Sequence, residues 1–528
     1  MRQLLPSFAL SALLLTGCQG DPATPEYWGK QLDNAQKPKE RMKVVEDLKA
    51  SGKVTASFLP LLHKKLETEK SAEVKASLVK LLAAQKDPSS VDAFIGAVDL
   101  ANTEPSANAL NKDIAGALAA SGDKKAVPTL RKLLKSRDPY VRIQAIEGLG
   151  ALKSPDVVPD LSDVATSDLE ENFISKKAII ALGNIGDAAA IPALTKMMFR
   201  ERKGVSFYAE SSFALFQVGP RSGDAMLTIL DGKDADLLAY AKEKGLKDAA
   251  LIAKAAMLAG DLRDARAEKQ LLGLLKYDNT MMDLKLIVRM QASEALGRLR
   301  SKEAVRPLST LLEEEEANAR GYYVRALTKI GSADAVPGLL RCAAKGPWDA
   351  REPCIQGVAA LGNEKAIAEL QKIAKAEGAA TAAECKDNPD YMGCKELPAL
   401  VKKHEDVLAT AQKPLAAAKA CGTDTACWTG KLTDADASVR VRAALELGRS
   451  GKAEAAASLM KQLSDKNLDA RLALIQALDW LSDDAAAGAE AKKLLPELEK
   501  QLESERGKTE FVKVNEDLRR LAVKLRRS

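Results

Sequence analysis

Histidine and cysteine build most metal and acid–base sites, and this chain is poor in histidine. Its 528 residues include two histidines, His63 and His404, and seven cysteines. His404 precedes Glu405, a pair able to ligate a metal, whereas His63 precedes Lys64. The sequence contains no GxSxG, Walker or HExxH motif. We therefore expect no catalytic centre, no cofactor and no metal site.

The first cysteine, Cys18, directly follows an apolar N-terminal run. Arg2 precedes a mostly apolar segment from Leu4 to Leu15, which is too short to span a bilayer and has the layout of a secretory signal. Leu15-Thr16-Gly17-Cys18 resembles the lipobox of bacterial lipoproteins. By that resemblance residues 1–17 are a signal peptide, Cys18 is the lipidated first residue, and Gln19 favours the outer membrane. The alternatives are an ordinary signal peptide with an incidental cysteine, or a buried start.

The other six cysteines lie beyond residue 340, and an even number in an exported protein favours three disulfides. Short spacing favours local pairing, although bridges between the groups stay open. A zinc site is the rival interpretation, but Cys-x8-Cys and Cys-x5-Cys lack the spacing of zinc ligand pairs. The candidate pairs are Cys342 with Cys354, Cys385 with Cys394, and Cys421 with Cys427.

Composition indicates helices packed closely together. Hydrophobic residues make up 46% of the chain but aromatic residues only 4%, and the apolar set is rich in alanine and leucine, which favour helices over strands. The formal net charge is +6, too small over this length for the concentrated basic face of a nucleic-acid binder. No segment after the N-terminal run has 18 consecutive apolar residues.

One pattern of about thirty residues recurs along the chain. Residues 123–152 contain two segments with helical apolar spacing, separated by a break at 136–139. Gly150 falls where a left-handed residue would end the second helix. Words similar to its opening "AVPTL" recur at 156–161, 189–194, 303–308, 334–339 and 365–370. Its closing Leu-Gly recurs, in this or a similar form, at 182–183, 218–219, 296–297, 330–331, 361–362 and 447–448.

These units resemble short HEAT repeats of the kind found in bacterial HEAT-like and phycobilisome-lyase-type proteins. The recurring proline, the Asp-x-x-Val-Arg start of the second helix and its Leu-Gly ending carry the resemblance. It implies an all-α fold, an α-solenoid (right-handed superhelix) of HEAT/armadillo-like helical hairpins with capped ends. The expected divisions are a signal peptide 1–17, a lipidated tether 18–25, degenerate repeats 26–122, HEAT-like repeats 123–376, a cysteine-containing insertion 377–433, HEAT-like repeats 434–483 and a C-terminal cap 484–528.

Four arginines occupy the same place at the start of their second helices: Arg142, Arg289, Arg440 and Arg471. In HEAT families such an arginine commonly pairs with an acidic residue, which implies a ladder inside the solenoid. An anion-binding groove is the alternative. The acidic run Glu313–Glu316 is interpreted as a solvated helix end.

The C-terminal segment predicts an amphipathic helix. Phe511, Val514, Leu518, Leu521 and Leu525 form one apolar stripe, opposite a face rich in lysine and arginine. A capping helix is the simpler interpretation, with its cations near the negative helix end. The alternative is a basic face that contacts anionic lipid or another envelope polymer.

The expected function is non-catalytic: a lipid-anchored scaffold, facing the periplasm, that binds a protein or an extended peptide along its concave face. The first alternative is envelope-polymer or lipid binding through the basic C-terminal helix. The second is a HEAT-like lyase. Deoxyhypusine hydroxylase, a HEAT-like enzyme, holds two irons with repeated His-Glu dipeptides, and the single pair His404-Glu405 cannot build that site. We expect no nucleic-acid partner, and the sequence leaves the partner and the oligomeric state unnamed.

Overall fold

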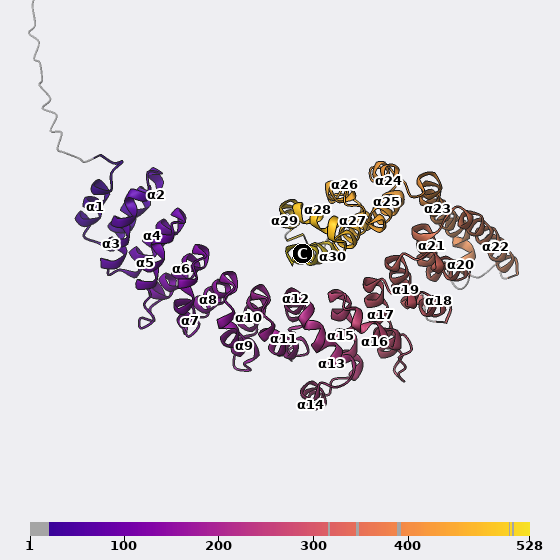
Figure 1. The fold of residues 1–528 in the computed structure, drawn as a ribbon, viewed down its shortest axis with the longest axis horizontal. Helices are drawn as coiled ribbons and strands as arrows, with labels where there is room; N and C mark the ends of the chain where they lie inside the picture. The colour runs from indigo at the N-terminus through magenta and orange to yellow at the C-terminus, as the bar shows by residue number, and fades with distance from the viewer. Residues whose placement is uncertain are drawn as a thin grey trace, which may run out of the picture. The chain divides into compact units, whose positions relative to one another are not determined.

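The computed structural model describes residues 21–314, 317–344, 348–387, 392–505, 507–508 and 512–527. Cys18, Phe511 and two residues of the acidic run, Glu315 and Glu316, lie outside them. The chain divides into unit 1, Met1–Val218, and unit 2, Gly219–Ser528. Within each unit, helical hairpins stack in succession, and the second helices of neighbouring hairpins lie side by side (Figure 1). Among the described residues, no helix is both long and apolar enough to cross a membrane.

Unit 1 consists of short helices joined by tight turns. Its helices are α1 Pro25–Asn34, α2 Pro38–Ser51, α3 Leu59–Thr68, α4 Ala72–Gln85, α5 Val91–Gly96, α6 Pro105–Ser121, α7 Val127–Leu133, α8 Pro139–Leu152, α9 Val158–Thr166, α10 Asn172–Ile185, α11 Ile191–Met198 and α12 Tyr208–Val218. Its 3₁₀ turns are η1 Ala56–Phe58, η2 Pro88–Ser90, η3 Lys124–Ala126, η4 Pro155–Val157 and η5 Ala188–Ala190.

Unit 2 repeats the same pattern and adds two long helices, α22 and α23. Its helices are α13 Gly223–Leu230, α14 Ala235–Lys244, α15 Asp248–Leu262, α16 Glu268–Leu274, α17 Met282–Leu299, α18 Val305–Glu314, α19 Ala317–Ile330, α20 Val336–Ala343, α21 Trp348–Leu361, α22 Lys365–Asp387, α23 Met392–Cys421, α24 Thr425–Lys431, α25 Ala437–Ser450, α26 Ala455–Lys461, α27 Leu468–Leu481, α28 Ala485–Lys493, α29 Leu495–Ser504 and α30 Val512–Arg527. Its 3₁₀ turns are η6 Pro220–Ser222, η7 Ala265–Ala267, η8 Lys302–Ala304 and η9 Ala333–Ala335.

The recurring residues explain where the helices begin. The carboxylate of Asp123 accepts the backbone N–H of Lys125 and starts turn η3, which leads into α7. The recurring proline lies in the first turn of α7, where its missing N–H costs no hydrogen bond. Asp138 caps α8 in the same way, accepting the N–H groups of Tyr140 and Val141. The recurring aspartate and proline residues therefore determine where the helices begin.

The glycine of the Leu-Gly ending has a different role from the one expected. Gly150 lies inside α8, which continues to Leu152, and Lys153 after it takes the left-handed conformation with φ 50°. A Cβ on Gly150 would lie 2.9 Å from the Cα of Ala181 on α10. The same close approach joins Gly183 with Ala214, Gly260 with Ala295, Gly297 with Ala326, and Gly448 with Ala477. The expectation for Gly150 is wrong, because the glycine lets neighbouring second helices approach closely.

One small β-hairpin departs from the all-helical pattern. Glu201–Arg202 (β1) pairs antiparallel with Val205–Ser206 (β2) between α11 and α12. The two turn residues, Lys203 and Gly204, both have positive φ, as a tight two-residue hairpin requires. Arg202 anchors the hairpin on the preceding repeat, since its Nε donates to Asn172 Oδ1 at 2.7 Å.

Charged contacts join the end of unit 2 to its beginning. Arg263, after α15, pairs with Asp479 and Asp483 at the end of α27. Lys524 of α30 reaches the same carboxylates, with its Nζ 3.0 Å from Asp479 Oδ1. Burial acts to raise the pKa of Asp479, but the charges of Arg263 and Lys524 hold it below its usual value. α15, α27 and α30 are thereby held together.

Candidate binding groove

A groove of about 810 Å³ crosses five neighbouring helices of unit 2. Most of its surface is apolar, and the helices α19, α21, α23, α25 and α27 each contribute side chains. Its apolar lining includes Val324, Ile355, Val407, Ala411, Pro414, Val441, Leu445 and Leu472. The volume lies within the range of binding pockets in proteins. The groove is the candidate functional site.

One wall of the groove comes from the segment expected to be a cysteine-containing insertion. α22 runs across residue 377, where the insertion was expected to begin, and α23 follows it as a second long helix. α23 packs against both α21 and α25, as a second helix of a repeat does. The segment therefore stacks with its neighbours through α23, whereas the sequence pattern predicted an insertion of Ala-rich helix and two cysteine loops.

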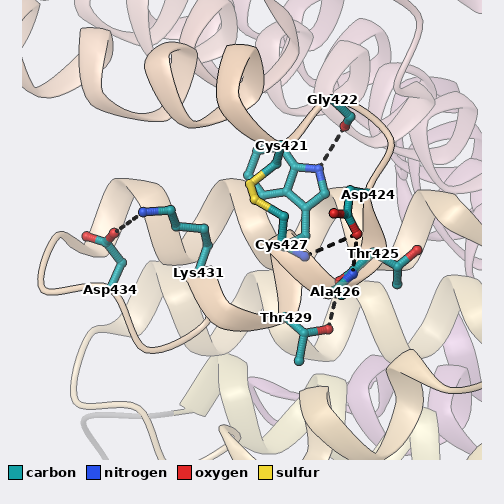
Figure 2. Close-up of a disulfide and its surroundings, with 10 residues drawn as sticks. Cys421, Gly422, Asp424, Thr425, Ala426, Cys427, Thr429, Lys431 and Asp434 are labelled. Atoms are coloured by element: carbon teal, nitrogen blue, oxygen red, sulfur yellow. Dashed lines mark hydrogen bonds and ion pairs between the residues drawn. A yellow bond between two sulfur atoms is a disulfide. The ribbon is translucent and has the colours of Figure 1, made fainter.

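A disulfide fixes the turn at the end of this wall. Cys421 at the end of α23 is bonded to Cys427 in α24. Figure 2 shows this bond, with Gly422 and Asp424 beside it in the turn. Trp428 is buried in the core below, and its Nε1 donates to Gly422 O at 2.9 Å. The bond and the indole together hold α24 against the end of α23.

The other cysteines are placed as follows. Cys342 of α20 is bonded to Cys354 of α21, and both are buried. Cys385 is disulfide-bonded, and the side chain of Cys394 lies outside the described residues. The side chain of His404 also lies outside them. Among the described residues, no group of three or more histidine, cysteine or acidic side chains is arranged to hold a metal ion.

Two arginines of α25, the buried Arg442 and the half-buried Arg449, hold it against the ends of α19 and α21. Nη1 of Arg442 donates to Ala359 O at 2.9 Å and to Gly362 O at 3.1 Å. Its Nε lies 2.8 Å from Glu446 Oε1. These carbonyls come from the end of a helix, where no backbone donor is left for them. Burial lowers the pKa of Arg442.

Arg449 makes a second connection of this kind. Its Nη2 donates to Thr328 O at 3.3 Å, and its Nη1 lies 3.0 Å from Glu446 Oε1. Its guanidinium carbon lies 5.7 Å from the centre of the Trp480 ring, and that of Arg300 lies 5.1 Å from it. Burial lowers the pKa of Arg449 to about 10. Arg442 and Arg449 thus fix the spacing of the helices below the groove.

These two arginines were not predicted from the sequence. Arg442, Glu446 and Arg449 follow one another at four and three residues, which places them on one face of a helix. That face also carries apolar residues. A charged side chain on it is therefore expected to be buried and to contact a hydrogen-bonding partner. The pattern was available in the sequence, but the partner carbonyls were not.

Arg142 and Arg440 each contact a carboxylate of a neighbouring repeat. Arg142 pairs with Glu170 of the next repeat, and its Nε donates to Leu134 O at 3.0 Å. Nε of Arg440 lies 2.6 Å from Asp465 Oδ2. Each guanidinium is already bonded to a carboxylate of the neighbouring repeat.

Arg471 and Arg289 make similar contacts. Nη2 of Arg471 lies 2.9 Å from Glu505 Oε1, and its Nε donates to Leu463 O at 3.1 Å. Nε of Arg289 donates to Tyr277 O at 2.8 Å. The carboxylate contacts of Arg142, Arg440 and Arg471 favour a structural ladder over an anion-binding groove.

The basic C-terminal helix α30 uses several of its cations inside unit 2. Lys524 contacts Asp479, Arg520 Nη2 lies 3.2 Å from Asp261 Oδ2, and Arg526 pairs with Glu499. Its apolar residues Val514, Leu518, Leu521 and Leu525 are buried. This arrangement favours the capping interpretation over a free basic face.

Asp436 caps α25 at the edge of the groove. Its carboxylate accepts the N–H of Ser438 at 2.9 Å and lies 2.6 Å from Nζ of Lys413 on α23. Burial acts to raise its pKa, but the hydrogen bonds from Lys413 and Ser438 lower the pKa to about 2. The cap therefore joins α25 to α23 across one side of the groove.

Asp436→Ala is expected to lower the free energy of unfolding by about 1 kcal/mol at pH 7, since it removes a helix cap. The pKa of Asp436 is lower in the folded chain than its ordinary value of 3.8. Its stabilisation is therefore present above about pH 4 and lost as the pH falls through about 2. Urea unfolding should show that the free energies of unfolding of variant and wild type differ less at pH 2.5 than at pH 7.

The exposed Asp406→Ala is the control, because Asp406 has no capping role. It should leave the unfolding free energy within about 0.5 kcal/mol of wild type at both pH values. If Asp436→Ala lowers the free energy of unfolding equally at both pH values, the role assigned to the carboxylate is contradicted.

Comparison with known proteins identifies the repeats. A family model described as HEAT repeats matches residues 98–174, 134–206, 283–359 and 428–506, which together make up half of the chain. The chain belongs to the HEAT-repeat family. The all-α fold of HEAT hairpins expected from the sequence is confirmed.

A curated relative and several solved structures are also similar to this HEAT-repeat chain. Over 164 residues it is 27% identical to phycocyanobilin lyase subunit alpha of Nostoc sp. (strain PCC 7120), covering 29% of this chain and 59% of that protein. The chain thus matches less than two thirds of that relative's length. Human deoxyhypusine hydroxylase in complex with glycerol is 17% identical, with 52% of this chain and 95% of that chain covered and a TM-score of 0.22. Kap121p bound to Pho4p is 12% identical, with 95% and 70% covered and a TM-score of 0.46.

Proposed function

We propose that this HEAT-repeat chain is a non-catalytic scaffold that binds a protein partner in the groove of unit 2. The observation that supports this most is the groove itself, where apolar side chains from five helices line a common surface. Apolar surfaces of this kind, rimmed by polar residues, mark interaction sites. The buried Arg442 and the half-buried Arg449 keep the helices at a fixed spacing, so the surface is formed before a partner arrives.

We further propose that the scaffold is lipid-anchored through Cys18 in the cell envelope, on the periplasmic side of the outer membrane. The support is the apolar run from Leu4 to Leu15 followed by the lipobox-like residues 15–18. Anchoring would hold the groove near the membrane and raise its effective concentration for partners there.

Photo-cross-linking in intact cells tests both proposals. A photo-cross-linking amino acid at Gln356, an exposed groove residue, is expected to give a discrete protein adduct. The same amino acid at the exposed Lys461 of α26, outside the groove, is the control and is expected to give none. Cys18→Ala is expected to move the chain out of the membrane fraction and to reduce the adduct at Gln356.

The outcomes separate the two proposals. Equal adducts at both positions, or none at either, contradict the groove as a protein-binding site. A Cys18→Ala chain that stays in the membrane fraction with unchanged mass contradicts the lipid anchor alone.

The likeness to a phycocyanobilin lyase subunit supplies a rival proposal, binding of an open-chain tetrapyrrole. It predicts that phycocyanobilin added to the purified chain binds and changes its absorption spectrum. We expect no such change. A spectral change that is lost when Leu472 in the groove is replaced by glutamine would favour the rival.

A further inference from the structure

Five of the polar side chains that line the groove already form hydrogen bonds within their own repeats. Oδ1 of Asn467 accepts the N–H of Ala470 at 3.0 Å, which caps α27. Ser438 Oγ lies 2.6 Å from Asp436 Oδ1. Three further lining residues bond within their own helices: Thr328, Gln356 and Thr410. An extended peptide brings unpaired backbone groups that need partners. In these five residues, bonds within the repeats already occupy the hydroxyl protons, the amide oxygen of Asn467 and one N–H of Gln356.

The apolar lining suits an occupant whose backbone is already paired. Ile355 and Leu445 are buried, while Val441, Leu472 and Val407 are half-buried at the groove surface. These residues come from α21, α23, α25 and α27, so the apolar surface continues from helix to helix across the stack. An α-helix satisfies its own backbone hydrogen bonds and needs only an apolar surface for one of its faces.

Two of the charged residues that line the groove, Arg325 and Asp469, lie on its outermost helices and give it a direction. Arg325, on α19, is exposed, and its guanidinium carbon lies 4.3 Å from the centre of the Tyr322 ring. Asp469 is exposed on α27, at the other end of the row of contacting helices α19, α21, α23, α25 and α27. Among the described residues neither side chain forms an ion pair, although the charge of Arg325 acts on the carboxylate of Glu294. The positive end of a helix dipole is its N-terminus and the negative end its C-terminus.

We propose that the groove binds one amphipathic α-helix of the partner, with its N-terminus toward Asp469 and its C-terminus toward Arg325. The apolar face of this helix carries residues at positions i, i+3, i+4 and i+7, and its last turn is acidic. This inference rests on the proposed function and specifies the chemistry of the partner at the same site.

Peptide display against the purified full chain tests the inference. The probe is a library of random peptides about 16 residues long, counter-selected on a Val441→Gln, Leu472→Gln double variant. Enriched peptides should show the i, i+3, i+4, i+7 apolar spacing with acidic residues near the C-terminus. Their helical circular dichroism should increase on binding, and the double variant should weaken binding at least about tenfold.

Leu502→Gln is the matched control. Leu502 is half-buried against the same core as Leu472 but lies outside the groove lining, so binding should stay within about twofold of wild type. Exchanging the charges, Arg325→Glu with Asp469→Lys, should weaken binding of the enriched peptides, because both ends of the bound helix then face like charge. Thermal unfolding of each variant identifies any loss of binding that comes from misfolding.

Three results would overturn the inference. Enriched peptides with prolines and no helical spacing would assign the groove to extended chains. Equal enrichment on wild type and the double variant would place the binding elsewhere. Binding of a fluorescent fatty acid with no enriched peptide would assign the groove to acyl chains. If any of these results is found and Gln356 still gives a protein adduct in cells, the helix inference fails and the scaffold proposal is retained. If helical peptides are enriched but Gln356 gives no adduct in cells, only the scaffold proposal fails.

Discussion

Replacing Arg442 with methionine is expected to lower the free energy of unfolding of unit 2 by about 3–5 kcal/mol. Methionine fills much of the same space, so packing changes little. The carbonyls of Ala359 and Gly362, however, lose their donor in a buried position. Glu446 keeps its contact with Arg449. The loss therefore comes mainly from two helix-end carbonyls left without hydrogen bonds.

Urea unfolding followed by tryptophan fluorescence measures this loss. Three of the four tryptophans, Trp348, Trp428 and Trp480, lie in unit 2, so the signal reports mainly on that unit. The control is Arg325→Met, an exposed arginine at the same groove, which should shift the free energy by no more than about 0.5 kcal/mol. If Arg442→Met lowers the free energy of unfolding no more than the control does, Arg442 does not hold α25 against α21.

Much of the fold follows from patterns within about thirty residues. Leucine and valine spacing predicts both helices of each hairpin, and capping residues such as Asp138 predict where they begin. These features depend on neighbours in the chain, so the sequence alone identifies them. The same reasoning placed Arg142 and Arg440 at equivalent positions, where the structure bonds each to a carboxylate of the next repeat.

The groove could not be predicted in this way. The expectation for residues 377–433 was an insertion of Ala-rich helix with two cysteine loops, because two cysteine pairs in turn-rich sequence are compatible with loops as well as with long helices. The groove depends on α23 lying between α21 and α25, a contact among segments far apart in the chain. The role of Glu446 could not be predicted for the same reason. The two arginines that it contacts, Arg442 and Arg449, donate to backbone carbonyls 83 and 89 residues away in the sequence.

The glycines of the recurring Leu-Gly motif show that one sequence motif can have two structural roles. A Leu-Gly pair near a helix end suits a left-handed cap, and Gly331 takes this conformation with φ 78°. Gly150, Gly183, Gly297 and Gly448 instead lie within helices opposite an alanine of the next repeat. Distinguishing the two needs the identity of the facing residue. Recurring alanines one repeat later are the signal that would have shown it.

Gly448→Ala is expected to destabilise unit 2 by about 2 kcal/mol, although alanine is the better helix former. The new Cβ would lie 2.6 Å from Ala477 Cα and 2.9 Å from Trp480 Cε3, so α25 and α27 must separate. Overpacking of this kind costs about 1–3 kcal/mol after relaxation. Gly430→Ala is the matched control, because Gly430 lies in α24 and a Cβ added there would have no atom within 4 Å.

The two substitutions are expected to have opposite signs. Gly430→Ala should stabilise by about 0.5–1 kcal/mol, the difference in helix propensity between glycine and alanine. Urea unfolding by tryptophan fluorescence measures both. Adding Ala477→Gly to Gly448→Ala should recover part of the loss, since it removes one of the two methyl groups that meet. A stabilising Gly448→Ala would mean that helix propensity outweighs contact at this position, and that the recurring glycine does not set the spacing of neighbouring repeats.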